Sequence, residues 1–122
     1  MKQALLIEDH ALFREGLALL LEWQTGLESV EAGSLAEGRR ALSDLRGTTD
    51  VAIIDLNLPD GDGSELIEQL RKTQPDVPVL ALTADRSLAW QARALEAGAD
   101  EVLAKATPVE QIIDAVELIR RR

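Results

Sequence analysis

Charged and hydroxyl side chains follow four short apolar segments of this chain, each at the point where the segment ends. Asp55 comes directly after residues 51–54, Val-Ala-Ile-Ile, which are typical of a strand buried on both faces. Three other apolar segments end in the same way, at the pair Glu8-Asp9, at Thr83 and at Lys105. Because open α/β sheets bind ligands at the carboxyl ends of their strands, we expect these side chains to converge on one edge.

Three carboxylates, one hydroxyl and one ammonium at one edge suit a divalent cation and a phosphoryl group. Magnesium prefers oxygen ligands and is commonly held by one or two carboxylates with phosphate and water. Asp9 and Asp55 are the predicted carboxylate pair, with Glu8 acting through water. A carboxylate can also attack phosphorus and form an aspartyl phosphate. Lys105 and Thr83 would then offset charge on the phosphoryl oxygens.

Most of these residues also have a purely structural explanation. The alternatives are a helix cap for Asp9, a solvated strand end for Glu8, a surface cation for Lys105 and a turn for Thr83. An acid directly after four buried residues, such as Asp55, has few structural uses. The coincidence of all four strand ends therefore favours a functional site, and His10 is expected to have no role in it.

Strand and helix patterns alternate along the chain, which favours βα units and a parallel sheet. Strands are predicted at about residues 4–7, 28–32, 51–54, 79–82 and 102–104, the second with the weakest pattern. Helices are predicted at about residues 11–24, 34–46, 64–73 and 87–97, and a fifth begins at Pro108. Capping boxes are expected at residues 34–37 and 107–110, and helix stops at Gly26, Gly47 and Gly98.

The composition predicts one globular domain over residues 1–122. The 122 residues are 46% hydrophobic and include no cysteine, which excludes disulfides and thiolate metal sites. Thirteen basic against twenty-two acidic residues give a net charge of −9, so direct contact with nucleic acid is not expected. No apolar run approaches the roughly 20 residues of a membrane span. A strand beginning near Gln3 leaves no room for a signal peptide, and a cytoplasmic setting is expected.

The site residues together resemble those of a known family. Glu8-Asp9, Asp55 with Pro59 and Gly63 after it, Thr83 and Lys105 are similar to the receiver domains of two-component response regulators, and the resemblance covers the whole chain. Residues 6–10, Leu-Ile-Glu-Asp-His, and 103–108, Leu-Ala-Lys-Ala-Thr-Pro, look most like receivers attached to LuxR-type DNA-binding domains.

The resemblance implies a flavodoxin-like (βα)5 fold, a doubly wound parallel sheet of order 2-1-3-4-5. It implies that Asp55 accepts a phosphoryl group from a histidine kinase or phosphotransfer protein, in a switch that is not an enzyme. Mg²⁺ would be held by Asp9, Asp55 and the Asn57 backbone carbonyl, with Glu8 assisting through water. Lys105 would pair with the phosphoryl oxygens. Thr83 would shift toward these oxygens. This shift would couple phosphorylation to the face near the fourth helix and fifth strand, and through that face to an effector. The LuxR-type resemblance implies that the effector is transcriptional.

Two positions depart from the family pattern. Most receivers carry Tyr or Phe three residues before the lysine, and here Val102 stands there, with little rotameric freedom. Many receivers also place proline after the lysine in a cis peptide, but here Ala106 follows, where a cis bond would cost about 2.5–4 kcal/mol. Phosphorylation is expected to survive both changes, whereas the manner of output is left open.

Two alternative functions are weighed. A haloacid-dehalogenase-like phosphatase also uses a strand-end aspartate as nucleophile, but it wants a second Asp two residues later, where this chain has Asn57. A degenerate receiver that binds partners without phosphate is supported only by Val102.

Apolar side chains outside the predicted core suggest a contact surface. On the first helix, Leu12, Leu19 and Trp23 form a stripe turned away from the core, and Leu118 lies opposite the core stripe of the last helix. Scattered surface apolar residues are normal, so the homodimer through the first and last helices is a hypothesis. Trp90 is predicted to face away from the 88–92–95 side of the fourth helix, as a second candidate contact.

Overall fold

The computed structural model of the protein describes residues 3–45, 49–85 and 87–122. Its main sheet has five parallel strands, β1 (Gln3–Ile7), β2 (Glu28–Ala32), β3 (Thr49–Asp55), β6 (Val79–Thr83) and β7 (Glu101–Ala104). The helices in these residues are α1 (Ala11–Thr25), α2 (Leu35–Leu45), α3 (Ser64–Thr73), α4 (Leu88–Ala97) and α5 (Val109–Arg120). A small antiparallel pair, β4 (Asn57–Leu58) and β5 (Gly61–Asp62), lies between β3 and α3.

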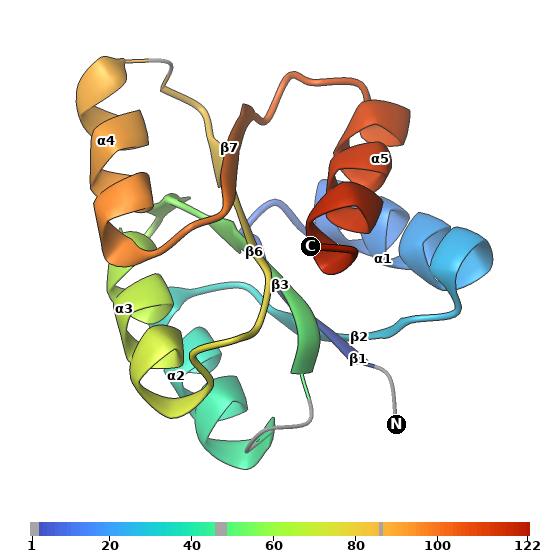
Figure 1. The fold of residues 1–122 in the computed structure, drawn as a ribbon, viewed down its shortest axis with the longest axis horizontal. Coiled ribbons are helices and arrows are strands. Elements are labelled where there is room, and N and C mark those ends of the chain that lie inside the picture. Colours follow the sequence, from blue (N-terminus) through green and yellow to red (C-terminus); the bar gives the residue numbers. More distant parts are fainter. Residues whose placement is uncertain (1–2, 46–48, 86) are drawn as a thin grey trace.

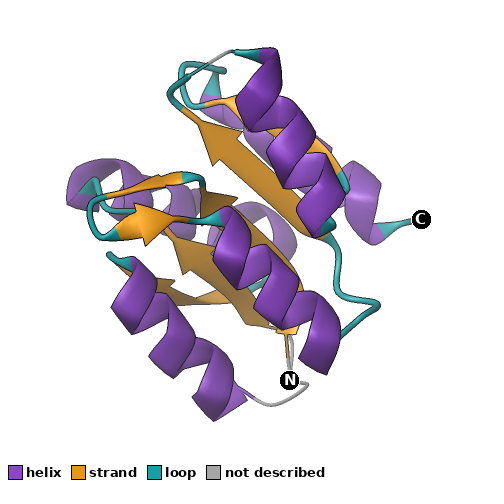
Figure 2. Ribbon diagram, turned by 90° about the vertical axis from the view of Figure 1, so that its left-hand side faces the viewer, coloured by secondary structure: helices purple, strands orange, loops and turns teal. Residues whose placement is uncertain are grey.

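The strands run in the order β2-β1-β3-β6-β7, which confirms the predicted 2-1-3-4-5 arrangement. Helices α1 and α5 cover one face of the sheet, and α2, α3 and α4 cover the other (Figure 1). The three helices of the second face lie side by side across the sheet (Figure 2). None of the helices in the described residues is both long and apolar enough to cross a membrane.

The pleat of each central strand divides its side chains between two cores. In β3, Ala52 and Ile54 belong to the cluster under α2, α3 and α4, whereas Val51 and Ile53 belong to the cluster under α1 and α5. All four are fully buried, which confirms the prediction of a strand covered on both faces. Strand β2 has exposed positions because it lies at an edge of the sheet, and this explains its weak pattern.

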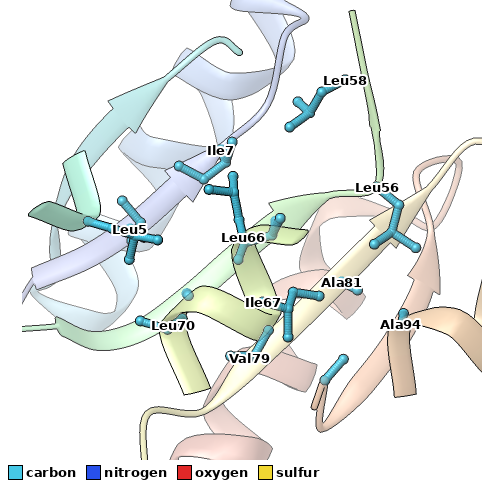
Figure 3. Packing of buried hydrophobic residues seen from close by; sticks show 14 of the residues in the cluster. Leu5, Ile7, Leu56, Leu58, Leu66, Ile67, Leu70, Val79, Ala81 and Ala94 are labelled. Atoms are coloured by element: carbon cyan, nitrogen blue, oxygen red, sulfur yellow. The ribbon is translucent and has the colours of Figure 1, made fainter. Parts of the chain in front are cut away.

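Helix α3 fixes the segment after Asp55 by packing on the centre of the sheet. Its residues Leu66, Ile67 and Leu70 are fully buried in one cluster with Leu5 and Ile7 of β1 and Val79 and Ala81 of β6, as the close-up of this core shows (Figure 3). Burial of each such side chain contributes roughly 1.5–3 kcal/mol. The start of α3 is therefore anchored, and so is the loop that leads from β3 to it.

Most predicted helix ends are confirmed. Gly26 and Gly98 adopt left-handed conformations, with φ of 76° and 118°, after α1 and α4. At the start of α2, the Ser34 hydroxyl accepts from the Glu37 N–H at 3.1 Å, while the Glu37 carboxylate accepts from Gly33 instead of Ser34. The predicted end of this helix at Arg46 and Gly47 lies outside the described residues.

The prediction that α5 begins with a capping box and a proline inside the helix is wrong. Pro108 is the N-cap, with an extended ψ of 139°, and no side chain caps the helix there. Its carbonyl accepts from Gln111 and Ile112, the first hydrogen bonds of the helix. The helix thus starts one residue later than predicted.

The predicted orientation of α4 is also wrong. Leu88 and Leu95 are exposed, whereas Ala94 is buried and Trp90 and Ala97 pack against the core. Both stripes are apolar, so the period alone could not choose between them. The small side chains of Ala94 and Ala97 let α4 lie close to α3 and β7 (Figure 2).

Candidate functional site

The sheet brings the four predicted strand ends together because β1, β3, β6 and β7 are consecutive neighbours. Ile7 is level with Ile54, Asp55 with Leu82, and Thr83 with Ala104. The residues that follow β1 and β7, and the last residues of β3 and β6, therefore meet at one edge. This is the arrangement that the sequence predicted for the carboxyl ends of the strands.

Lys105 is the centre of the cluster. Its Nζ lies 2.9 Å from Glu8 Oε2, 3.3 Å from Asp55 Oδ2 and 3.9 Å from Asp9 Oδ1. The predicted convergence of the ammonium and the three acids is confirmed. A surface position for Lys105 is excluded, because about three quarters of its side chain is buried (24% exposed).

The three acids differ in their burial. Glu8 and Asp55 are fully buried, whereas the Asp9 side chain is 39% exposed. Glu8 is therefore not the solvated strand end of the structural alternative. Asp9 is not a helix cap either, since His10 is the N-cap of α1 and no side chain caps that helix. The side chain of His10 takes no part in the cap, whereas the backbone N–H of His10 donates to Glu8 Oε2 at 2.8 Å.

The acidic cluster can hold a metal ion. One oxygen each from Glu8, Asp9 and Asp55 lie within 4.8 Å of one another. Glu8 Oε1 is buried and has no hydrogen-bond partner among the described residues, so the cluster contains an unused acceptor. Buried polar atoms without partners are rare in native proteins. Carboxylate oxygens are ligands for hard divalent cations, so the residues present fit such an ion.

The pKa values of Asp55, Asp9 and Lys105 depart from their ordinary values. Burial raises the pKa of Asp55 to about 7, and the charge of Glu8 and the hydrogen bond to Asp9 add to this. The Asn57 N–H at 2.9 Å and the Lys105 charge act in the opposite direction. At Asp9, burial acts to raise the pKa, but hydrogen bonds and the charge of Lys105 lower it overall. At Lys105, burial acts to lower the pKa, but hydrogen bonds and the charges of Asp55 and Glu8 raise it overall. Without a cation, Asp55 thus holds its proton up to near neutral pH.

Thr83 reaches the site through Asn57, an interaction that sequence reasoning missed. Thr83 Oγ1 lies 3.1 Å from Asn57 Oδ1, and the Ala84 N–H donates to the same Oδ1 at 2.8 Å. The hydroxyl also accepts from the Asp85 N–H at 3.0 Å and lies 2.8 Å from the Asp85 carbonyl oxygen. The turn interpretation of Thr83 is therefore partly right. Its single proton serves either Asn57 or Asp85, and no described hydrogen bond joins it to the three acids.

Two further residues shape the loop after Asp55. A Cβ at Gly63 would lie 2.0 Å from the Asp55 carbonyl oxygen, so this close approach requires glycine, as expected of a loop that curls back. Asp60 accepts from the N–H groups of Leu35 and Ala36 and so caps α2 from another segment. These hydrogen bonds lower the pKa of Asp60. An acid in a turn carries no sequence signal for a helix start 25 residues earlier.

The two departures from the family pattern are also placed. Val102 is half-buried and packs against the core under α4. The described residues contain no cis peptide bond, so the bond between Lys105 and Ala106 is trans. With both departures present, Lys105 contacts Glu8, Asp9 and Asp55.

Known proteins resemble this chain over nearly all of its length. A family model of the response regulator receiver domain matches residues 4–117. The methanol utilization control regulatory protein MoxX of Paracoccus denitrificans is 34% identical, over 98% of this chain and 53% of that protein. The transcriptional regulatory protein PhoP of Escherichia coli K12 is 32% identical, over 98% and 52%. The chain spans about half the length of these curated relatives.

Solved structures agree with this assignment. A response regulator from Burkholderia pseudomallei, solved with a phosphorylated aspartic acid, calcium ion and citrate, has a TM-score of 0.82 and 34% identity, covering 99% of this chain and 69% of that one. A LuxR-family two-component response regulator from Aurantimonas has a TM-score of 0.84 and 29% identity, covering 98% and 84%. With the same fold, and with matches that span nearly the whole chain, the protein belongs to the receiver domain family of two-component response regulators.

Proposed function

We propose that Asp55 is the phosphoacceptor of a signalling switch. The observation that carries this is the placement of one buried carboxylate 3.3 Å from an ammonium and within a cluster of two further acids. A strand-end carboxylate of this kind can act as nucleophile toward phosphorus. Its raised pKa of about 7 fits a site that is completed by positive charge.

The proposed cofactor is Mg²⁺, held by Asp9, Asp55 and the Asn57 backbone carbonyl, with Glu8 bound through water. The unpaired Glu8 Oε1 supports the water-mediated contact. The Burkholderia neighbour, whose structure contains both a phosphorylated aspartic acid and a calcium ion, supports a divalent cation in this family. When bound, the ion neutralises charge on the acids and on phosphoryl oxygens.

The transfer step uses few protein groups. A deprotonated Asp55 oxygen forms a bond to phosphorus while the phosphorus–nitrogen bond of a phosphohistidine breaks, and the histidine takes up a proton. The donor is a histidine kinase or a phosphotransfer protein. Lys105 is proposed to move from Glu8, now 2.9 Å away, to pair with the new phosphoryl oxygens. Thr83 is proposed to give up one of its two acceptors and donate to phosphate.

Labelling with a small phosphodonor tests the assignment. Phosphoramidate with Mg²⁺ is expected to add one phosphoryl group, measured by intact mass spectrometry, and EDTA is expected to prevent it. Asp55→Asn should abolish labelling. Asp60→Asn is the matched control, because Asp60 lies in the same loop but contacts α2 instead of the acidic cluster. Labelling that persists in Asp55→Asn would reject Asp55 as the acceptor.

A phosphatase is the alternative that this site supports less well. Such an enzyme needs a general acid two residues after the nucleophile, and Asn57 has no acidic proton. Its Oδ1 is also occupied by Ala84 and Thr83. We therefore expect no turnover of small phosphate esters beyond slow hydrolysis of the proposed aspartyl phosphate.

We also propose that the domain forms a homodimer through α1 and α5. Leu12, Leu19 and Trp23 are 77%, 69% and 82% exposed on one stripe of α1, and Leu118 of α5 is 54% exposed. Contiguous exposed apolar patches commonly mark interaction sites, and the shared stripe of the three α1 residues supports such a patch here. In ultracentrifugation with a phosphate analogue, Leu19→Lys and Leu118→Lys should prevent association, whereas Leu88→Lys on α4 should not. A monomer at high concentration with and without the analogue contradicts the proposal.

The output of the switch is proposed to be transcriptional control in the cytoplasm. Two observations support this: PhoP is a transcriptional regulatory protein, and the LuxR-family neighbour is a two-component response regulator. With a net charge of −9, the chain itself is not proposed to contact DNA. Its role would be to change the activity of an effector when Asp55 is phosphorylated.

A further inference from the structure

The two ends of the loop between Asp55 and Gly63 are in direct contact. The Gly63 N–H donates to the Leu56 carbonyl at 3.0 Å, and the backbone at Gly63 touches the Asp55 carbonyl oxygen. Asp62 directly precedes Gly63 and is thereby held close to the end of β3. The residue after Asp62 is thus hydrogen-bonded to the residue after Asp55.

Asp62 connects this loop to α4. Its Oδ1 accepts from the Ser64 N–H at 2.9 Å, which fixes the carboxylate at the start of α3. Its Oδ2 pairs with Arg93 Nη1 at 3.0 Å. The Arg93 guanidinium in turn lies 5.0 Å from the centroid of the Trp90 ring, within the range of cation–π attraction.

Trp90 completes the connection by reaching the core. It is half-buried and packs against the cluster that contains Leu56, the residue after Asp55. Val102 packs against the same cluster and is small and rotamerically restricted. Trp90 is the largest of the partly buried side chains on this cluster, so the buried area of its ring is the most sensitive to a change in packing.

We infer that Asp62, Arg93 and Trp90 form a relay that carries the phosphorylation state of Asp55 to α4. The inference rests on the proposed function and names the regulation that follows from it. A phosphoryl group and a cation beside Asp55 change the charge and position of the loop, and the Asp62–Arg93 pair and the Trp90 ring respond. Arg93 is half-exposed, so the pair is weakly bound and can rearrange at small cost. That is what a two-state element requires.

Tryptophan fluorescence can test the relay directly. The chain has two tryptophans, so in Trp23→Phe the emission comes from Trp90 alone. Addition of beryllofluoride with Mg²⁺ is expected to change this emission, and Asp55→Asn should remove the response. Arg93→Gln and Asp62→Asn, each in the Trp23→Phe background, should reduce the change by at least half, while phosphoramidate labelling by mass spectrometry stays at the level of the parent.

Arg39→Gln is the matched control. The Arg39–Glu65 pair is also an exposed ion pair, at 2.7 Å, but it joins α2 to α3, and neither residue belongs to α4. It should leave the Trp90 response unchanged. A response that is absent in a fully labelled parent, or equally large in Arg93→Gln, overturns the relay while leaving Asp55 as the acceptor. Loss of labelling in the parent would instead overturn the proposed function.

Discussion

Two ionic clusters lie at opposite ends of the sheet, and they differ in how completely their charged groups are paired. At the amino-terminal end of β6, Arg71 pairs with Asp100 at 3.0 Å, and Asp100 accepts from the Val79 N–H at 2.8 Å. Arg71 also donates to the backbone carbonyls of Pro75, Val77 and Gly98. One cation, one anion and the nearby backbone thus satisfy one another.

At the carboxyl end, one ammonium faces three carboxylates. Lys105 contacts Glu8, Asp9 and Asp55, yet Glu8 Oε1 has no partner among the described residues, and burial raises the pKa of Asp55 to about 7. Unpaired groups and shifted pKa values cost stability, and natural proteins tolerate them mainly at functional sites. The comparison separates a cluster whose charges are paired within the fold from one whose acids could hold a metal ion.

Removal of Arg71 should break the satisfied cluster and cause the largest loss of stability. In Arg71→Met the carbonyls of Val77 and Gly98 lose their donor, and Asp100 loses its counter-charge. We expect the free energy of unfolding to fall by about 2–4 kcal/mol, measured by urea denaturation. Phosphoramidate labelling of the folded variant should not change, because the cluster is at the other end of the sheet.

Arg39→Met provides the control for this prediction. The Arg39–Glu65 pair has both side chains about half exposed, so its loss should change the free energy of unfolding by about 0.5 kcal/mol or less. Equal losses in the two variants would show that the Arg71 cluster is no more than an ordinary surface ion pair.

Asp55→Asn should stabilise the protein, in a pH-dependent way, when no divalent cation is present. The pKa of Asp55 rises from its ordinary value of 3.8 to about 7 on folding. Between these values the unfolded chain binds fewer protons than the folded one, so the stability of the parent falls as pH rises from about 4 to 7. The variant lacks this loss. A pKa difference of about three units corresponds to roughly 4 kcal/mol, so we expect the variant to gain up to about 4 kcal/mol relative to the parent by pH 8, and nothing near pH 4.

Urea denaturation in EDTA across this pH range measures the difference, and Asp60→Asn checks its sign. The N–H groups of Leu35 and Ala36 lower the pKa of Asp60, so its stabilising effect is present above the ordinary pKa and lost at lower pH. Asp60→Asn should therefore weaken the protein more as pH rises, opposite to Asp55→Asn. A difference between Asp55→Asn and the parent that is constant with pH would contradict the raised pKa.

The sequence predicted the carboxyl-end cluster better than the amino-end one. Asp55 and Lys105 each end a strand with a clear hydrophobic pattern, and the parallel topology then brings them together. Arg71 lies near the end of a helix and Asp100 in a turn, where charged residues are common and carry no distinctive signal. Their pairing depends on how α3 and β7 meet, which local patterns do not encode.

Side-chain detail at the site was predictable only in part. For Asn57, only its backbone carbonyl was expected to take part in the site, as a ligand of Mg²⁺. The contact of the Asn57 side chain with Thr83 was not predicted, because it depends on the spacing of two loops. The face of α4 was misassigned because Leu88 and Leu95 are larger than the alanines that pack inward. Large apolar residues are usually buried, but a helix that lies close to its neighbours selects small ones.

Divalent cations should stabilise the carboxyl-end cluster and leave the amino-end cluster unaffected. Mg²⁺ at ten times its dissociation constant should raise the free energy of unfolding by about 1.4 kcal/mol, if it binds only the folded state. Asp9→Asn should remove most of this increment, because Asp9 is the most exposed of the three acids and a proposed direct ligand. Arg71→Met should keep the full increment on its lower baseline. If Mg²⁺ raised the stability of Asp9→Asn and the parent equally, the ion would be binding elsewhere, and the unpaired Glu8 oxygen would need a different explanation.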